Sequence, residues 1–130
     1  MSARIIPVEL PQEHDRVQTK LDILQGTLDL MVLRTLSTMG ALHGYGIARR
    51  IEQVSGDRVI LNQGTIYTSL VRLEERGLIR STWGVSENNR RARFYSITTA
   101  GERQLVAETR NWERLAAVMS RVLASGASDE

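Results

Sequence analysis

Three arginines stand within four positions, Arg90, Arg91 and Arg93, in the polar stretch "SENNRRAR" at residues 86–93. Clustered guanidinium groups favour an anionic partner, because each can donate several hydrogen bonds to a phosphate or a carboxylate. A second stretch, "NQGTIYTS" at residues 62–69, combines short polar side chains with a tyrosine. Such groups can bind phosphates and the edges of bases. Both stretches indicate recognition of a nucleic acid rather than a reaction.

The charge distribution agrees with an anionic partner for the middle of the chain. Residues 43–97 contain nine arginines and five acidic residues, a net charge of +4, whereas the rest of the chain has a net charge of −2. Uneven charge of this kind is informative even when the total is only +2. A mixed, solvated surface is the alternative explanation.

Residues suited to catalysis are scarce. The chain has no cysteine, which removes disulfides, thiolate metal sites and cysteine nucleophiles. His14 and His43 are far apart and have no carboxylate pattern around them, so we expect no metal site, no cofactor and no enzymatic activity. The N-terminus lacks the apolar core of a signal peptide, and no apolar run approaches about 18 residues. We therefore expect a soluble, cytoplasmic protein.

Helical periodicity follows an N-terminal arm. Residues 1–20 contain both prolines and no sustained pattern, so we expect a flexible arm there. From Leu21, apolar residues recur every four positions up to Gly40, which predicts a first helix buried on more than one side. A second amphipathic helix is expected within "HGYGIARRIEQVSG", stopping at Gly56.

A third helix should carry the stretch at residues 62–69. Asn62 is suited to cap its N-terminus, and Ile66, Leu70 and Leu73 share one apolar face before Gly77. The polar residues expected on the opposite side are Gln63, Thr65, Thr68, Ser69 and Arg72. Free backbone N–H groups in the first turn favour a phosphate, and Arg72 could reach a guanine edge or a phosphate one turn further along. Gly64 would allow close approach of the backbone to DNA.

The sequence then changes to the two-residue period of β-strands. Alternating β-branched and aromatic residues on both sides of residues 86–93 predict a hairpin. Asn89 and the three arginines would form its tip, since asparagine tolerates the backbone angles of tight turns. Trp83 is expected to pack at the base of the hairpin.

A long helix is expected at the C-terminal end. Thr99 and Glu102 have the spacing of a reciprocal capping box. The apolar positions that follow form an a/d-like seam, made of Leu105, Trp112, Leu115, Met119 and Val122, with Glu108 as a polar exception. A helix with such a seam should pack against a partner.

The order helix, helix, helix, hairpin, long helix predicts a mainly α fold with a small β-hairpin, a winged helix-turn-helix. The expected organisation is a flexible arm at 1–20, a DNA-binding domain at 21–98, a dimerisation helix at 99–125 and a disordered tail at 126–130. In such a domain the third helix enters the major groove and the hairpin lies along the backbone or minor groove. The expected DNA contacts are Gln63, Gly64, Thr65, Tyr67, Thr68, Ser69, Arg72, Asn89, Arg90, Arg91 and Arg93.

The string "GTLDLMVLRTL…HGYGIARRIE…NQGTIYTSLVRLEERGLI…RRARFYSITTAGERQL" resembles the PadR family of bacterial transcriptional regulators. The match runs from about Leu24 to Leu123, and the short length is similar to the subgroup with a single C-terminal helix. Most specific are "GTIYTSLVRLEERGLI" and the exit from the wing, "RFYSIT..G". Thr68 stands where the family often has proline, which removes a rigid element from the first turn.

The resemblance implies roles for particular residues. Tyr67 matches the tyrosine that contacts operator DNA, and the three tip arginines match the basic wing. Family members are homodimers in which the last helix embraces the partner's first helix, and several bind planar hydrophobic effectors between the subunits. Trp112 lies where relatives use a tryptophan pair to stack such ligands. The resemblance therefore implies a homodimeric repressor of transcription that is relieved by a small-molecule or other signal.

Alternatives exist at each level. Tyr67 could be a half-buried core residue, the tip arginines could only solvate a loop, and Trp112 could be dimer core rather than a ligand platform. The whole domain could be a winged-helix protein–protein interaction module without an effector, although arginines at the hairpin tip argue against apolar contacts there. A small enzyme would need converging catalytic groups that the sequence does not contain.

Overall fold

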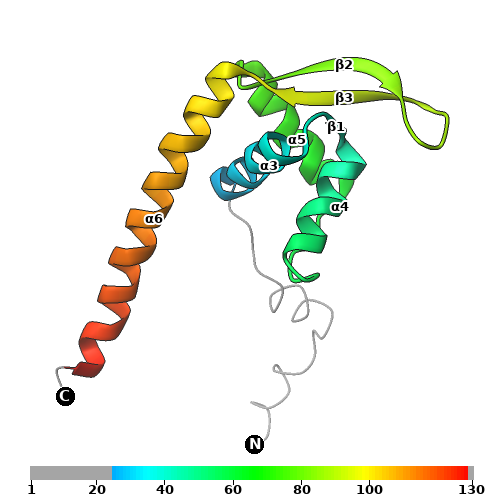
Figure 1. Ribbon diagram of the computed structural model, residues 1–130. Coiled ribbons are helices and arrows are strands. Elements are labelled where there is room, and N and C mark those ends of the chain that lie inside the picture. Colours follow the sequence, from blue (N-terminus) through cyan, green and yellow to red (C-terminus); the bar gives the residue numbers. More distant parts are fainter. Residues whose placement is uncertain (1–24, 129–130) are drawn as a thin grey trace, which may run out of the picture.

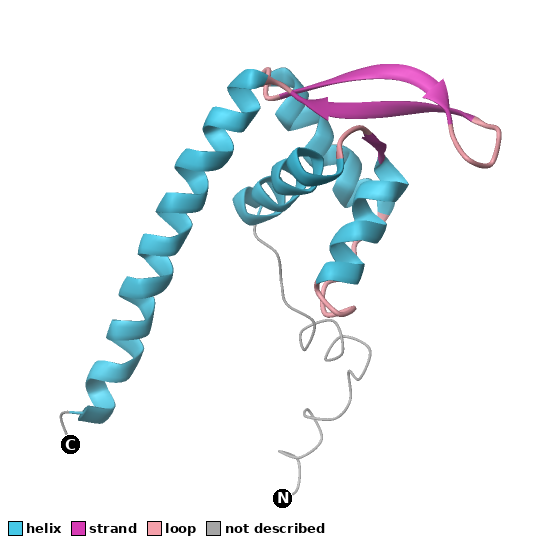
Figure 2. Cartoon of the chain, in the orientation of Figure 1, coloured by secondary structure: helices cyan, strands magenta, loops and turns pink. Residues whose placement is uncertain are grey.

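The computed structural model describes residues 25–128, and the expected arm at residues 1–20 lies outside them. The elements are α3 (Gln25–Met39), β1 (Leu42–His43), α4 (Gly44–Val54), α5 (Gln63–Glu75), β2 (Ile79–Val85), β3 (Arg91–Ile97) and α6 (Thr99–Ser128). Three helices pack together, the β2–β3 hairpin extends from them on one side, and α6 leaves on the other (Figure 1, Figure 2). The expected mainly helical winged fold is confirmed.

The core forms where α3, α4 and α5 meet. Val32, Leu33 and Leu36 of α3 are fully buried, as are Ile47 of α4 and Ile66 of α5. The four-residue spacing of apolar positions along α3 places them on the side that the other two helices cover. Each such side chain stabilises the fold by about 1.5–3 kcal/mol relative to an exposed one. The core therefore fixes α5 against α3, which sets the face that α5 presents to solvent.

The segment between α4 and α5 has no regular structure but is anchored at several points. Val59 and Leu61 are buried, and the N–H of Leu61 donates to Glu52 Oε2 over 3.1 Å. The next residue, Asn62, caps α5 by accepting from the N–H of Thr65 over 2.8 Å. The predicted cap is confirmed, and the anchored segment fixes the position at which α5 begins.

The sheet has three antiparallel strands in the order β1-β3-β2. β2 and β3 form the expected hairpin, with Trp83 opposite Arg93 and Val85 opposite Arg91. Asn89 adopts the left-handed conformation in the connecting turn, with φ 60°, as its place at the predicted tip requires. β1, which pairs with the inner end of β3, has only two residues. A strand so short carries no period, and for this reason no pattern in the sequence indicated it.

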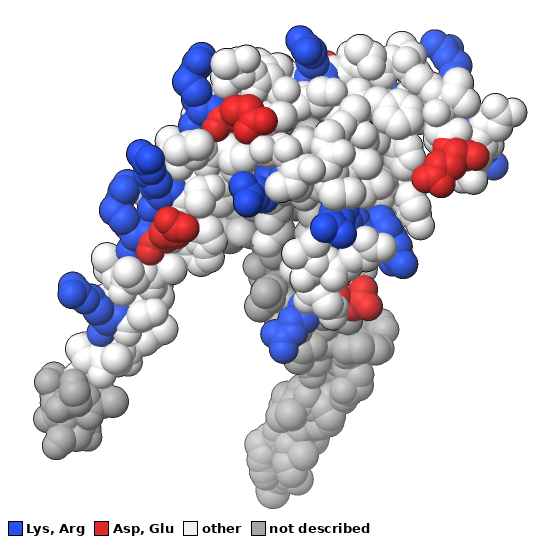
Figure 3. All heavy atoms as spheres, viewed as in Figure 1, with Lys and Arg blue, Asp and Glu red and all other residues white. Residues whose placement is uncertain are grey.

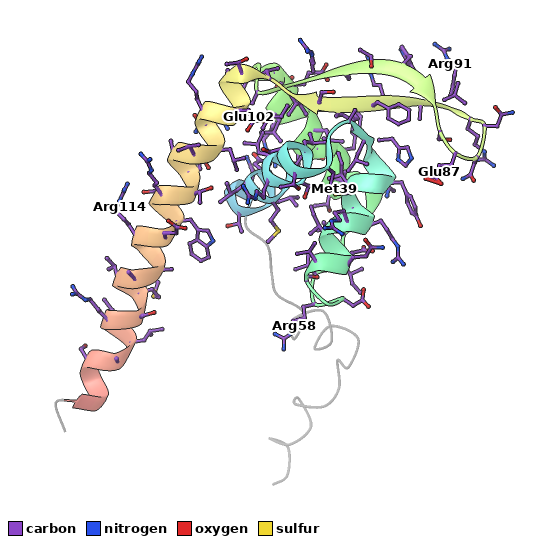
Figure 4. The ribbon with its side chains drawn as sticks, viewed as in Figure 1. Met39, Arg58, Glu87, Arg91, Glu102 and Arg114 are labelled. Atoms are coloured by element: carbon purple, nitrogen blue, oxygen red, sulfur yellow. The ribbon has the colours of Figure 1, made fainter. Side chains whose placement is uncertain are left out.

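The start of α6 differs from the predicted capping box. Thr98, not Thr99, supplies the cap, because its Oγ1 accepts from the N–H of Gly101 over 3.0 Å and donates to the Gly77 carbonyl over 2.8 Å. Glu102, at the start of α6 in Figure 4, accepts a hydrogen bond from the Ser37 hydroxyl of α3. The predicted reciprocal pair is therefore wrong, since the Glu102 carboxylate is used in packing α6 against α3.

Close contact at Gly101 fixes α6 to the rest of the fold. A Cβ atom at this position would lie 2.1 Å from the Leu78 carbonyl oxygen and 2.6 Å from Ile97 Cγ1, so only glycine fits. One turn later Leu105 is buried, with 4% of its surface exposed, in the core of this same chain. Leu105 was expected in the partner-facing seam, and the close contact explains why that expectation is wrong.

Beyond this contact α6 extends away from the body. Its 30 residues correspond to a length of about 45 Å at about 1.5 Å per residue. The helix runs to Ser128, past the predicted end at residue 125, so residues 126–128 are helical rather than part of a tail. Residues 129–130 lie outside the described part. Within that part, the side chains of α6 from Trp112 to residue 126 are exposed or half-buried.

Candidate nucleic-acid interface

A groove of about 440 Å³ lies between the N-terminal part of α5 and the wing, the β2–β3 hairpin. Gln63 and Tyr67 of α5 form one wall, and Arg90, Arg91 and Arg93 form the other. The two stretches singled out in the sequence, more than twenty residues apart in the chain, thus face one groove. The geometry suits an extended, negatively charged ligand, because hydrogen-bonding groups and cations lie on facing walls.

The first turn and a half of α5 presents its polar groups outward. Gln63, Thr65 and Thr68 are exposed, and so is Tyr67, with 62% of its surface accessible. The alternative of a half-buried core tyrosine is therefore wrong. The Thr68 hydroxyl donates to the Gly64 carbonyl over 2.9 Å, which leaves its oxygen lone pairs as acceptors. Unpaired N–H groups of the first turn add a partial positive charge beside these side chains.

Gly64 lies on the outer surface of α5. The only atom near a Cβ added there would be its neighbour Asn62 Oδ1, at 3.4 Å. The backbone at this position is open to solvent, so a ligand on the outer face of α5 could approach it closely, although Gly64 does not line the groove. This agrees with the reason for which Gly64 was included among the expected contacts.

Ser69 and Arg72 are not on this outer face. Ser69 is fully buried, with 0% of its surface exposed, and its hydroxyl donates to Asp29 Oδ1 over 2.6 Å. Arg72 donates to the same carboxylate from Nη2 over 2.7 Å and from Nε over 3.2 Å. The hydrogen bond to Asp29 raises the pKa of the Arg72 guanidinium, and desolvation opposes it. The expectation that both residues lie on the outer side of the helix is wrong.

The reason lies in a partner that helical spacing could not reveal. Ser69 lies three residues after Ile66 and next to Leu70, at the border of the buried face. Asp29 is a buried acid within the apolar run of α3, forty positions away in the sequence. Burial of a charge requires a partner, and here two residues of α5 supply it. Ser69 and Arg72 therefore hold α5 in place and do not belong to the candidate interface.

The wing carries its arginines toward the outer end. Asn89, Arg90, Arg91 and Arg93 are exposed. The guanidinium carbons of Arg91 and Arg93 lie 4.5 and 5.1 Å from the centre of the Trp83 ring. Trp83 has 57% of its surface exposed, so its expected packing at the base of the hairpin is wrong. Figure 4 shows Arg91 and Glu87 projecting from different edges of the wing.

The inner end of the groove contains Tyr95, which is buried. Burial raises the pKa of the Tyr95 phenol, and the positive charge of Arg93 lowers it in part. Of the wing arginines, Arg93 is thus the one whose charge acts on the inner end of the groove.

Two further residues of the groove were missed in the sequence, His43 and Tyr45. His43 caps α4, since its Nδ1 accepts from the N–H of Gly46 over 3.0 Å, and its ring packs edge-on against Phe94 with the centres 5.4 Å apart. Tyr45 is exposed beside it. The available signal was the position of His43 directly before a helical stretch, where an acceptor side chain is favoured.

Basic side chains are not confined to the groove. Figure 3 shows them over the wing, the helices and α6 on the visible face, with fewer acidic side chains among them. The wing arginines differ from the others in facing the groove together with α5. Neither Arg91 nor Arg93 forms an ion pair with an acidic side chain of the described residues.

A second exposed feature is a stripe on α6. Trp112, Leu115, Met119 and Val122 are spaced by three and four residues, which places them on one face of the helix. Each has about half or more of its surface exposed, 51% for Trp112. A face of four large apolar side chains is unusual for a helix in water. These four residues are called the α6 stripe below.

Other site chemistries lack support in the described part of the chain. Residues 25–126 contain no group of three His, Asp or Glu side chains placed to hold a metal ion. Between residues 25 and 128, no helix has both the length and the apolar character that a membrane span requires.

Three packed helices with an antiparallel wing, and a helix that presents polar groups beside that wing, define a winged helix-turn-helix, a DNA-binding class of fold. The chain belongs to the PadR-like family of transcriptional regulators, whose family model matches residues 32–107. Its fold and its family thus agree on regulation of transcription through DNA.

Individual proteins similar to this chain include an uncharacterised protein and two solved structures of transcriptional regulators. An uncharacterised 37.1 kDa protein in a transposon of Streptomyces fradiae is 40% identical over 101 residues, which cover 78% of this chain but only 26% of that protein. A transcriptional regulator from Clostridium thermocellum has a TM-score of 0.67 at 28% identity, covering 75% of this chain and 90% of the other. A PadR family regulator from Clostridium difficile has a TM-score of 0.63 at 28% identity, covering 74% and 97%.

Proposed function

We propose that the chain is a homodimeric repressor that binds an operator sequence in duplex DNA. The observation that carries the proposal is the single groove shared by the exposed start of α5 and the wing arginines. Within the major groove, Gln63, Thr65 and Tyr67 would contact base edges and nearby phosphates. The wing would lie along the adjacent backbone, with Asn89 and the three arginines as phosphate contacts. A repressor of this kind would act in the cytoplasm.

Dimerisation is proposed through α6. The α6 stripe exposes apolar side chains that gain about 25 cal/mol for each Å² removed from water. A second copy is the natural cover, because a two-fold axis would pair the stripe with a surface of the same chain and present two α5 helices to DNA. Half-sites about 34–36 Å apart would then be expected. Leu105 is excluded from this interface, since it is part of the core of its own chain.

Relief by a planar hydrophobic effector is proposed at Trp112. The exposed indole lies within the α6 stripe, where an aromatic ligand could stack on it at the dimer interface. Such a ligand would weaken repression only if it bound the DNA-free dimer more tightly than the DNA-bound one. Stable Trp112 fluorescence and stable operator affinity across a panel of planar hydrophobic compounds would refute this part of the proposal.

A mobility-shift titration with duplex DNA from upstream of the protein's own coding sequence tests the central claim. We expect Tyr67→Ala and the double variant Arg90→Ala/Arg91→Ala each to weaken binding at least tenfold, in line with about 1–3 kcal/mol for a good contact. Arg103→Ala is the matched control, since it removes an exposed arginine from α6 and should bind like the wild type. Undiminished binding in both test variants would sink the proposal. Binding of a protein partner without DNA would favour the interaction-module alternative.

A further inference from the structure

We propose that Trp83 is a positioning residue for DNA binding, whose indole holds the guanidiniums of Arg91 and Arg93 ready for neighbouring phosphates of the DNA backbone. The inference rests on the proposed DNA-binding function and adds a role for a residue outside the groove. Trp83 itself does not line the groove, whereas both arginines do.

Strand register brings the three side chains together. Trp83 of β2 pairs with Arg93 of β3, and the next pair on the same face of the sheet is Val85 with Arg91. Arg93 therefore lies directly opposite the indole and Arg91 lies diagonally opposite. Their guanidinium carbons are 5.1 and 4.5 Å from the ring centre, within the range of a cation–π contact. The register places the three side chains on one face of the hairpin, within reach of one another.

Burial does not account for the tryptophan. More than half of its surface is exposed, and it belongs neither to the core cluster nor to the residues packed against it. A tryptophan that keeps more than half of its surface in water gains less from burial than one in the core, so its place on the wing calls for a further explanation. Its closest described ring contacts are the two cations. What the ring contributes is the placement of those cations.

The arrangement also leaves both charges exposed to solvent. No acidic side chain of the described residues pairs with either arginine. Both cations lie close to one ring, so their separation is at most the sum of the two distances to its centre. Two cations on one face of the wing create a local positive potential that attracts an anion. The phosphates of duplex DNA, spaced along a strand that the wing would follow, are anions that two neighbouring cations can bind together.

Holding the arginines in advance raises affinity without adding a contact. A free arginine side chain loses rotamer freedom when it binds a phosphate, and a side chain already stacked on a ring loses less. Loss of the ring should therefore weaken DNA binding by roughly tenfold, the scale expected when two flexible side chains must be ordered on binding. Because both cations remain, the number of phosphates neutralised should not change.

Salt dependence separates positioning from direct contact. Operator binding would be measured between about 50 and 200 mM salt for the wild type, Trp83→Thr, Trp83→Leu, Trp83→Phe and Arg91→Ala/Arg93→Ala, the range over which phosphate contacts dominate the change. Threonine suits a strand, leucine keeps apolar volume without a π face, and phenylalanine keeps a ring. Val85→Thr is the matched control, because Val85 is exposed on the same face of the same strand.

We expect Trp83→Thr and Trp83→Leu to lose about tenfold in affinity at every salt concentration, with an unchanged slope, and Trp83→Phe to retain most of the affinity. The arginine double variant should lower the slope by up to about 1.8, at about 0.9 for each phosphate that the protein no longer neutralises. In that double variant, Trp83→Leu should have less than about twofold further effect, since the ring has no cations left to position.

Three results would overturn the inference. Trp83→Leu could bind like the wild type, it could change the salt slope, or it could weaken binding equally with and without the two arginines. Circular dichroism and a thermal melt of each variant identify a loss of folding. If Trp83→Thr unfolds the wing, the affinities of Trp83→Phe and Trp83→Leu still test whether the ring positions the arginines. Failure of the wild type to bind duplex DNA would instead refute the proposed function.

Discussion

Two clusters that contain arginine, a buried one and an exposed one, have opposite properties in this molecule. In one, Arg72 of α5 and the Ser69 hydroxyl both bind the Asp29 carboxylate of α3, and the charges are neutralised at the edge of the core. In the other, Arg91 and Arg93 lie against an exposed tryptophan and have no acidic partner among the described residues. The first arginine is committed within the fold, and the second pair is left available to a ligand.

The difference shows what decides the role of an arginine. The sequence supplied only residue type and spacing for Arg72, Arg91 and Arg93, and on those grounds all three were expected to contact DNA. The presence or absence of an acidic partner distinguishes Arg72 from the other two. A guanidinium bound to a buried carboxylate stays with that partner, because its departure would leave a buried charge unpaired. A guanidinium on an aromatic face keeps its charge open to an anion.

Removing the carboxylate should have the largest effect. Asp29→Ala leaves the buried Ser69 hydroxyl and the half-buried Arg72 guanidinium without their acceptor. We expect the free energy of unfolding to fall by about 3 kcal/mol, the lower end of the range for breaking a buried pair, because Arg72 is partly exposed. Urea denaturation followed by circular dichroism measures the change.

The double variant Asp29→Ala/Arg72→Met is the control for this expectation. It removes both charges, so it should be more stable than Asp29→Ala alone. If the double variant were the less stable of the two, the pair would not be the source of the effect. The buried cluster would then no longer differ from the exposed one in its contribution to stability.

A smaller loss is expected from Ser69→Ala. The hydroxyl donates a short bond to a charged acceptor that keeps its contacts with Arg72, so about 1.5 kcal/mol of unfolding free energy should be lost. Operator affinity of the folded protein should stay within about twofold of the wild type, since nothing of Ser69 reaches the surface. Thr65→Ala, on the exposed face of the same helix, should show the reverse pattern. If Ser69→Ala lost much of its operator affinity while its stability stayed unchanged, Ser69 would have to be a DNA contact after all.

Long regular elements were predictable because their patterns repeat. The helices and the hairpin followed from apolar periods of about four and two residues, and the cap at Asn62 followed from its residue type. The exposed start of α5 followed from the same period, since Ile66 and Leu70 fix the inward face and Tyr67 then points outward. Sequence reasoning therefore placed Gln63 and Tyr67 correctly on the exposed side of α5, and their contacts with DNA stay a prediction.

What failed depended on contacts between elements. Asp29 is forty positions from Ser69, and no local pattern joins them. Trp83 needed the strand register to place it beside two arginines rather than at the base of the wing. Leu105 obeyed the heptad spacing, but the approach of Gly101 to the Leu78 carbonyl holds that part of α6 in the core. Spacing along one element shows which residues share a face, and tertiary contacts decide what covers it.

On the exposed cluster, the arginine double variant should affect stability less than either substitution at the Asp29 site. Arg91→Ala/Arg93→Ala removes two exposed cation–π contacts, each about 0.5–1 kcal/mol at most in such a setting. We expect the free energy of unfolding to fall by about 1 kcal/mol, the lower end of the sum for two such contacts, because exposed contacts are screened by solvent. Measured under the same denaturation conditions as Asp29→Ala, a loss as large as that of the buried cluster would remove the distinction between the two.

The smallest effect should be found where the exposed cluster reaches the core, at Tyr95. Burial raises the pKa of its phenol, and Arg93 lowers it in part. Because the folded state holds the proton more tightly than the unfolded chain, this contribution to stability is complete below a pH of about 10 and is lost as pH rises through the folded-state pKa. Arg93→Ala should raise that pKa further, while Arg103→Ala, on α6, should leave it unchanged. Absorbance titration near 295 nm, with Tyr95→Phe used to subtract the two exposed tyrosines, measures the shift.

If Arg93→Ala left the titration of Tyr95 unchanged, the charge of Arg93 would have no effect at the inner end of the groove. The exposed cluster would then act only on a ligand near the tip of the wing.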